Sequence, residues 1–141
     1  MVIHESAEDY LEAILALREE TGGPVHSIDI VNRLGFSKPS VSIAMKKLRE
    51  NGYISMAGDG SITLNDTGME IAAKIYGRHK TMTRLFESLG VSPKQAAEDA
   101  CKVEHDLSNE TYDKILEFLR HCRESGCAYV REQRNGAAPL S

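Results

Sequence analysis

The sequence predicts a mainly α-helical protein with one short β-hairpin near residue 60. Six segments repeat apolar residues every three to four positions, which is the spacing of one helical face. Two short segments rich in β-prone residues flank a Gly-containing turn, which is typical of a hairpin. Of the 141 residues, 41% are hydrophobic and 27% are charged, so the chain has the length and composition of a globular protein with a core.

Three helices are predicted in the N-terminal part of the chain, over residues 6–20, 27–34 and 38–50. Each has a serine at or just before its start, and we expect Ser6, Ser27 and Ser37 to be the N-caps. Pro39 stands in the first turn of the third helix, where its missing N–H costs no hydrogen bond. An Asn-Gly pair follows this helix and is expected to end it.

The hairpin is predicted from two strands, residues 53–56 and 61–64, joined by a turn. Three more helices are predicted after it, over residues 67–89, 92–105 and 109–122. Thr67 and Glu70 form a capping-box pattern at the start of the first of these helices. Ser92 and Gln95 mark the start of the second in the same way.

The formal net charge of −4 by itself argues against nucleic-acid binding, but the charge is unevenly distributed. Residues 25–50 hold five basic side chains and two acidic ones, whereas residues 1–24 hold six acidic side chains and one basic one. A basic segment inside an acidic protein suits DNA binding that another part of the molecule controls. No long apolar run, signal peptide or disulfide framework is visible, so the expected location is the cytoplasm, with no membrane partner.

A short helix, a Gly turn, a second helix and a hairpin occur in the order of a winged helix-turn-helix. The second of these helices has an apolar face and an opposite face of small, polar and basic residues. The predicted DNA-contacting residues are Ser37, Lys38, Pro39, Ser40, Ser42, Ile43, Lys46 and Lys47. Serine and lysine suit phosphates, while Pro39 and Ile43 suit thymine methyl groups. The alternative is a helical hairpin for protein contact with solvated lysines, and the β-hairpin argues against it.

Cys101, Glu104 and His105 stand at positions i, i+3 and i+4, so a helix would place a thiol, a carboxylate and an imidazole on one face. These groups are three ligands for a soft-to-borderline divalent metal. Two carboxylates, Asp9 and Glu12, share a face of the first helix in the same way. The sequence therefore suggests a metal site beside a DNA-binding module.

Each candidate ligand also has a structural explanation. His79, on the long helix, could be a hydrogen-bonded core histidine, and Cys101 a small buried apolar residue. Asp9 could complete a helix cap, and Glu12 could be a solvated surface residue. Spacing alone leaves both explanations open. A further group, His121, Cys122 and Cys127, matches no standard zinc spacing, so we expect no second metal or redox site there.

Four motifs occur along the chain: SAEDYLE at 6–12, FSKPSVS at 36–42, RH at 78–79 and EDACKVEH at 98–105, the last followed by LS at 107–108. Together and in this order they resemble the diphtheria toxin repressor family, which contains iron-dependent and manganese-dependent transcriptional repressors. The resemblance covers roughly residues 5–119. It implies an N-terminal winged helix joined to a helical dimerisation domain, with a metal site between them and no enzymatic activity.

The resemblance implies a set of six metal ligands: Asp9, Glu12, His79, Cys101, Glu104 and His105. Two carboxylates in the first motif match the manganese branch of the family, whereas a cysteine in the last motif matches the iron branch. We expect Fe²⁺ as the cofactor, with Mn²⁺ as the alternative, because a thiolate prefers Fe²⁺ to the harder Mn²⁺. Thr83 and Ala97 occupy the places of ligands to the iron branch's ancillary site, which argues against that site here.

The expected domains are a winged helix-turn-helix over residues 1–66, a helical metal-binding and dimerisation domain over 67–124, and a flexible tail over 125–141. We expect no SH3-like domain of the kind that longer members carry. The expected function is metal-activated repression of metal homeostasis genes by a homodimer bound to an inverted-repeat operator. The expected dimer surface consists of Met82, Leu85, Phe86, Ile115 and Leu119. The alternatives are a winged-helix regulator with a purely structural ligand cluster, and a metalloenzyme, for which no separate general base or phosphate loop is found.

Overall fold

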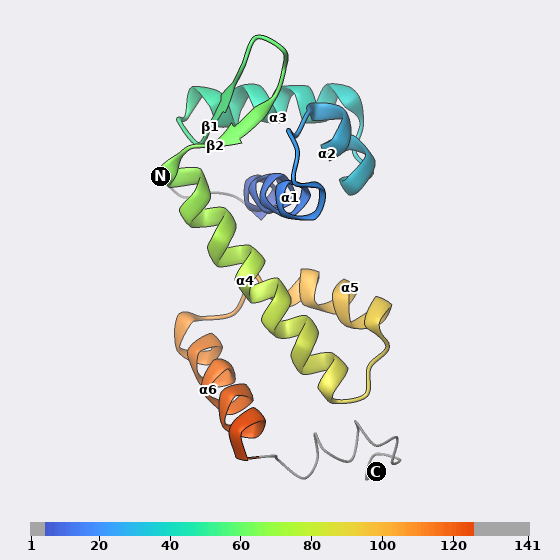
Figure 1. Ribbon diagram of the computed structural model, residues 1–141, viewed down its shortest axis with the longest axis vertical. Helices are drawn as coiled ribbons and strands as arrows, with labels where there is room; N and C mark the ends of the chain where they lie inside the picture. The colour runs from blue at the N-terminus through green and yellow to red at the C-terminus, as the bar shows by residue number, and fades with distance from the viewer. Residues whose placement is uncertain (1–4, 126–141) are drawn as a thin grey trace. The chain divides into compact units, whose positions relative to one another are not determined.

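The computed structural model describes residues 5–125 and shows a mainly α-helical chain with one two-stranded sheet (Figure 1). The elements are α1 (Glu5–Thr21), α2 (Ser27–Leu34), α3 (Lys38–Glu50), β1 (Ile54–Met56), β2 (Ile62–Leu64), α4 (Asp66–Ser88), α5 (Pro93–Val103) and α6 (Asn109–Ser125). The predicted fold class is confirmed. The predicted tail beyond residue 125, Cys127 included, lies outside the described residues. Two compact units divide between Tyr76 and Gly77, inside α4.

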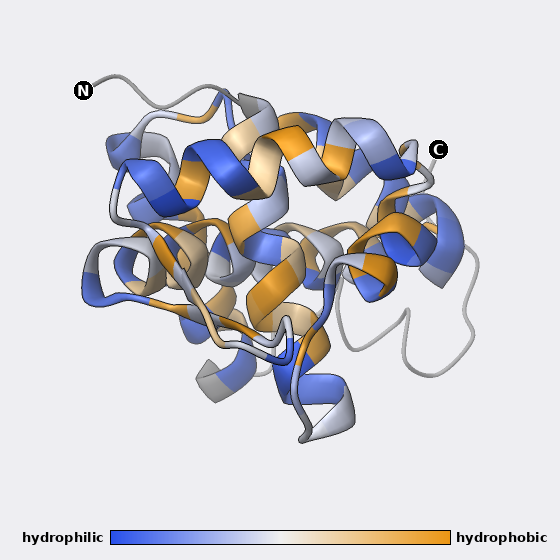
Figure 2. Cartoon of the chain, turned by 90° about the horizontal axis from the view of Figure 1, so that it is seen from above, coloured by the Kyte–Doolittle hydropathy of each residue, from blue (hydrophilic) through white to orange (hydrophobic). Residues whose placement is uncertain are grey.

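The first unit contains α1, α2, α3, the hairpin and the first part of α4. Hydrophobic and hydrophilic residues are interspersed along the helices of the chain (Figure 2), as in helices that bury one apolar face. The core of the unit draws on all of these elements and consists of Tyr10, Leu11, Ile14, Leu15, Val25, Ile30, Val41, Met45, Leu48, Ile54, Ile62 and Ala72. One core shared by three helices and a hairpin is the architecture of a winged helix-turn-helix.

The β-hairpin is antiparallel, with Ser55 opposite Thr63. Each strand is one residue shorter than predicted. The backbone of Ile62 also donates to the carbonyl of Val25 at 2.7 Å, which ties the hairpin to the segment before α2. The wing therefore has a fixed base beside α3.

Two of the predicted helix caps are confirmed. Ser37 Oγ accepts from the backbone N–H of Ser40 at 3.3 Å, and Ser92 Oγ accepts from that of Gln95 at 3.4 Å. Both serines are followed by a lysine and a proline in the first turn, in either order, and the proline needs no hydrogen-bond acceptor there.

Three other predicted helix starts are wrong in detail. Ser6 lies inside α1, which already begins at Glu5. The N-cap of α2 is His26 and not Ser27, and the backbone N–H of His26 donates to Asp29 Oδ2 at 2.8 Å. Thr67 does not cap α4, because its hydroxyl donates to the carbonyl of Gly52 at 3.2 Å. Thr67 contacts a residue fifteen positions earlier in the chain, whereas His26 contacts Asp29, three positions later.

The start of α4 packs closely against the residues that precede β1. A Cβ on Gly68 would overlap the backbone carbonyl oxygen of Tyr53, so only glycine fits at this position. Asn65 adds a second tie there, because its side-chain amide donates to the carbonyl of Gly52 at 3.0 Å. The end of α3 and the first turn of α4 are thus held together.

The second unit contains the rest of α4 together with α5 and α6. Ala96 and Ala100 are fully buried on α5. The hydroxyls of Thr81 on α4 and Tyr112 on α6 lie 3.3 Å apart. The prediction that α5 reaches His105 is wrong, because the helix ends at Val103 and Glu104 is its C-cap. None of the helices within residues 5–125 has the length and apolar composition that crossing a membrane requires.

Candidate metal centre and nucleic-acid interface

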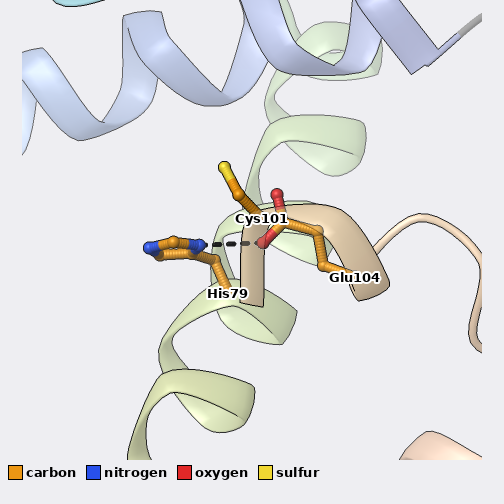
Figure 3. Close-up of side chains that lie close together, drawn as sticks. All are labelled: His79, Cys101 and Glu104. Atoms are coloured by element: carbon orange, nitrogen blue, oxygen red, sulfur yellow. Dashed lines mark hydrogen bonds and ion pairs between the residues drawn. The ribbon is translucent and has the colours of Figure 1, made fainter. Parts of the chain in front are cut away.

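Three predicted metal ligands come together in the second unit. His79 lies on α4, Cys101 on α5, and Glu104 at the C-cap of α5. One ligand atom of each, an imidazole nitrogen, the thiol sulfur and a carboxylate oxygen, lies within 4.8 Å of the others. Figure 3 shows the imidazole of His79 and the carboxylate of Glu104 facing each other with the thiol of Cys101 beside them. The structure thus assembles a mixed N, O and S donor set from two helices.

The carboxylate of Glu104 is the centre of this group. Its side chain is fully buried, and Oε2 lies 2.9 Å from Nδ1 of His79. The other oxygen, Oε1, lies 3.5 Å from Nε2 of His105. A buried carboxylate between two imidazoles is retained only where its charge is balanced by a proton or a cation. Such an arrangement suits a metal ion.

Helix α5 ends before His105, yet Cys101 and Glu104 still lie close together, as their spacing predicted. The backbone of Glu104 keeps nearly helical angles, with φ −61° and ψ −30°, and its N–H donates to the carbonyl of Ala100. Glu104 therefore still faces the same side as Cys101. Cys101 is exposed, so the explanation of this cysteine as a small buried apolar residue is wrong.

The guanidinium of Arg78 is a functional candidate that the sequence analysis missed. It is buried beside the site and donates to the backbone carbonyls of Glu104, at 3.1 Å, and Leu107, at 2.6 Å. The sequence does contain a signal for this burial. Arg78 stands three residues after Ile75 and four before Met82, two buried positions of the same apolar stripe.

The remaining predicted ligands, Asp9 and Glu12, lie on α1 in the first unit. Both are half-buried and stand one helical turn apart, so they share a face as predicted. Tyr10 stands between these two residues in the sequence. Burial raises the pKa of Tyr10, and the negative charge of Asp9 raises this pKa further. Ligation of one ion by these carboxylates together with residues of the second unit stays a prediction.

The donor chemistry of the described site fits a divalent transition metal. Imidazole, thiolate and carboxylate groups are ligands for Fe²⁺, Co²⁺ and Zn²⁺, and carboxylates also suit Mn²⁺. Thr83 is half-buried on α4, and neither it nor Ala97 supplies an ionised ligand for a second ion. The described residues thus provide ligands for one site of this type in the second unit.

The outer face of α3 has the properties predicted for a DNA-binding helix. All eight predicted contact residues, Ser37, Lys38, Pro39, Ser40, Ser42, Ile43, Lys46 and Lys47, are exposed. Val41, Met45 and Leu48 on the opposite face are buried in the core. The separation of the two faces leaves the basic and polar side chains available to a partner.

The basic residues of α2 and α3 differ in how available their charges are to a DNA partner. Arg33 Nη1 lies 2.7 Å from Glu20 Oε2, so its charge is already paired. Lys46 Nζ lies 4.0 Å from Glu50 Oε1, and both side chains are more than half exposed, so this pair is weak. Phosphate contact is therefore expected from the lysines of α3 and not from Arg33.

Sequence comparison covers both units. A model of the N-terminal DNA-binding domain of iron-dependent repressors matches residues 3–62, and a model of their metal-binding and dimerisation domain matches residues 65–130. An uncharacterised helix-turn-helix transcriptional regulator of Methanocaldococcus jannaschii is 36% identical over 85% of this chain and 97% of its own length. The transcriptional regulator MntR of Salmonella typhimurium is 36% identical over 82% of this chain and 73% of its own length.

The chain belongs to the iron-dependent repressor family. The resemblance to the diphtheria toxin repressor family is thereby confirmed. Members of this family are metal-dependent transcriptional repressors and not enzymes, so the metalloenzyme alternative is wrong. Their DNA-binding and dimerisation domains indicate that operator DNA and a second copy of the chain are the partners in this family.

Structural comparison agrees with the family assignment. A solved manganese-dependent transcriptional repressor in complex with manganese matches with a TM-score of 0.70 and 28% identity. The match covers 77% of this chain and 50% of that one, so the chain spans about half the length of this manganese-dependent relative.

Proposed function

We propose that this chain is a transcriptional repressor that binds operator DNA as a homodimer when Fe²⁺ is bound, and that it controls metal homeostasis genes in the cytoplasm. The observation that carries the proposal is the grouping of His79, Cys101 and Glu104 within 4.8 Å, in the domain that matches the family's metal-binding domain. A purely structural cluster would gain little from an imidazole, a thiol and a buried carboxylate at one point.

The proposed ligands are Asp9, Glu12, His79, Cys101, Glu104 and His105. A bound divalent ion would supply the positive charge that offsets the carboxylates and the thiolate. Without that charge, the carboxylates of α1 and Glu104 repel each other when they approach. The acidic side chains of α1 are therefore the part of the proposed site that links metal binding to the DNA-binding domain.

Cys101 is the reason to prefer Fe²⁺ over Mn²⁺. A thiolate is a soft ligand and favours Fe²⁺, and affinity for most sites also rises from Mn²⁺ to Fe²⁺. The carboxylates Asp9 and Glu12 suit either ion. Mn²⁺ remains the second candidate, because a solved relative at 28% identity is a manganese-dependent repressor complexed with manganese.

The proposed operator is an inverted repeat, because a twofold dimer presents two copies of α3 related by its axis. Lys46 and Lys47 are proposed to contact phosphates, and Pro39 and Ile43 to contact base edges. Ile43 supports this division, since its apolar side chain is 57% exposed on the outer face of α3. Exposure of this kind is expected of a residue that meets thymine methyl groups.

The proposed dimer surface lies on α4 and α6 of the second unit. An open groove of about 500 Å³ is lined by Leu85, Glu110, Thr111, Lys114, Ile115 and Phe118. Phe118, one of these lining residues, was not predicted and is 54% exposed. Met82 was predicted to belong to this surface, but it is buried. All of the lining residues lie within residues 65–130, which match the family's metal-binding and dimerisation domain, and this supports a second copy as the occupant.

The proposal is tested by anaerobic titration of DNA binding with Fe²⁺ and with Mn²⁺, for the wild type and for Cys101→Glu. Wild type should respond at lower free Fe²⁺ than free Mn²⁺, and the substitution should shift the preference toward Mn²⁺. If the wild type responds to Mn²⁺ at a lower free concentration than to Fe²⁺, the iron assignment is wrong and Mn²⁺ is the activating ion. A wild type whose DNA binding ignores both ions would leave a winged-helix regulator with a structural cluster.

A further inference from the structure

We propose that Arg78 is a positioning residue of the metal site, because its buried guanidinium holds the segment that carries Glu104 and His105. This inference rests on the proposed function, since it takes these two residues as metal ligands. Arg78 does not itself offer a ligand atom, because a guanidinium stays protonated in proteins.

The guanidinium connects the end of α5 to the start of α6. Nη1 donates to the carbonyl of Glu104 at 3.1 Å and to that of Leu107 at 2.6 Å. Nη2 donates to Oδ1 of Asn109, the first residue of α6, at 2.6 Å. The ring of Tyr112 lies 5.1 Å from Cζ and covers the cation. One planar group thus fixes both ends of the connection over residues 104–108.

This connection needs such a tie for a physical reason. The last carbonyls of a helix have no partner within the helix, and a buried carbonyl without a donor destabilises the fold. Arg78 is only 3% exposed, and within residues 5–125 its hydrogen-bond acceptors are two backbone carbonyls and one amide oxygen, all neutral. A cation buried without a carboxylate is a costly way to stabilise a loop. The buried guanidinium instead holds its acceptors in a fixed arrangement, because the N–H groups of this planar group point in fixed directions.

Glu104 is held at two points by consecutive residues of α4. Arg78 binds its backbone carbonyl, and the imidazole of His79 contacts its carboxylate, Nδ1 to Oε2, at 2.9 Å. The two side chains therefore determine where the main chain and the carboxylate of Glu104 lie relative to α4. The following residue, His105, takes its position from the same anchored backbone. Loss of the Arg78 contacts should loosen both proposed ligands without removing a ligand atom.

The experiment titrates Co²⁺ into the metal-free protein and records the absorption of the bound ion, which reports its ligands and geometry. Arg78→Lys keeps the positive charge but loses the planar set of N–H donors, and Asn109→Ala removes one of the three acceptors. Asn109→Asp keeps an oxygen at that place and serves as the conservative rescue. Arg84→Lys, at an exposed position of the same helix, is the matched control.

We expect Co²⁺ affinity to fall roughly 10- to 100-fold in Arg78→Lys, with an altered spectrum, as for other residues that orient ligands. Asn109→Ala should lose less affinity than Arg78→Lys, while Asn109→Asp and Arg84→Lys should bind as wild type does. In the metal-free protein, the backbone amides of residues 104–109 should exchange faster in Arg78→Lys and Asn109→Ala. Thermal unfolding, measured alongside, confirms that each variant is folded at the titration temperature.

The inference is overturned if folded Arg78→Lys and Asn109→Ala bind Co²⁺ with wild-type affinity and spectrum, because Arg78 then serves stability alone. If Arg78→Lys does not fold, the asparagine pair decides: weaker binding by Asn109→Ala than by Asn109→Asp supports the inference, and equal binding refutes it. A wild type that binds no Co²⁺ refutes the proposed metal function itself, and this inference with it.

Discussion

His79 Nδ1 and Glu104 Oε2 lie 2.9 Å apart although 25 residues separate them in the sequence. This contact joins α4 to the C-cap of α5 and brings two proposed ligands together. With Cys101 and His105, four of the six proposed ligands belong to one unit. The other two, Asp9 and Glu12, belong to the DNA-binding unit, so they are the residues through which we expect metal to act on DNA affinity.

Because the ligands are divided between the two units, substitutions should affect metal affinity and the metal-dependent gain in DNA affinity to different extents. Asp9→Asn should lower the metal-dependent gain in DNA affinity more than it lowers metal affinity, because the ligands of the second unit remain. His79→Ala should lower both together. Metal affinity is measured by calorimetry and DNA affinity by fluorescence anisotropy, with Glu19→Gln on exposed α1 surface as the charge-matched control. Loss of metal affinity in Asp9→Asn equal to that in His79→Ala would contradict the division.

Two glycines of α4 predict opposite effects of the same substitution. Gly68→Ala should destabilise the protein by about 1–3 kcal/mol, because its Cβ would overlap the carbonyl of Tyr53. Gly77→Ala should stabilise it by about 0.5–1 kcal/mol, because alanine favours the helix and its Cβ would lie 3.8 Å from the Tyr112 hydroxyl. Urea unfolding of the three proteins measures both changes. Equal effects of the two substitutions would show that the close approach at Gly68 is not a constraint.

The two kinds of side chain on the outer face of α3 predict different losses. Lys47→Ala should weaken binding to all DNA sequences and reduce the slope of log affinity against log salt by about 1. Ile43→Ala should mainly reduce the preference for operator over random DNA. Binding is measured at several salt concentrations, with Lys94→Ala on exposed α5 surface as the control. If Ile43→Ala lowers the affinity for operator and for random DNA equally, Ile43 does not take part in base recognition.

The exposed aromatic ring of Phe118 predicts a test of the dimer surface. Phe118→Lys should shift the protein from dimer to monomer at micromolar concentration, because it places a charge in an apolar interface. Phe118→Leu keeps an apolar side chain and should remain dimeric. Sedimentation velocity in the presence of metal distinguishes the two states. A Phe118→Lys protein that stays dimeric would place the interface elsewhere.

Much of the first unit was predictable because its signals are local. Ser37, Pro39 and the Asn-Gly pair define α3 from neighbouring residues, and the exposed and buried faces follow from helical spacing. The N-cap role of His26 and the absence of such a role for Thr67 were not predicted, because histidine is not a common N-cap residue and Thr67 contacts a distant part of the chain. Thr67, for example, donates to Gly52, fifteen residues earlier. Such a contact exists only once the hairpin has folded.

The sequence predicted which residues belong to the candidate site, but not how their side chains and backbone are arranged. Spacing identified Cys101 and Glu104 as sharing a face, and the structure agrees even though α5 ends at Val103, between the two residues. Arg78 was overlooked because a buried arginine whose acceptors are backbone carbonyls leaves no charge partner in the sequence. The carbonyls of Glu104 and Leu107 become its partners only through the chain reversal between α5 and α6.

The central claim is that metal held at Glu104 controls DNA binding, and one measurement tests it directly. DNA affinity is measured anaerobically with and without Fe²⁺ for the wild type, Glu104→Gln and Asp106→Asn, the last removing a nearby exposed carboxylate. Fe²⁺ should raise the DNA affinity of the wild type and Asp106→Asn by roughly 5- to 150-fold, a coupling of about 1–3 kcal/mol. Glu104→Gln should show no such gain while keeping the metal-free DNA affinity of the wild type. A full Fe²⁺ response in folded Glu104→Gln would contradict the claim.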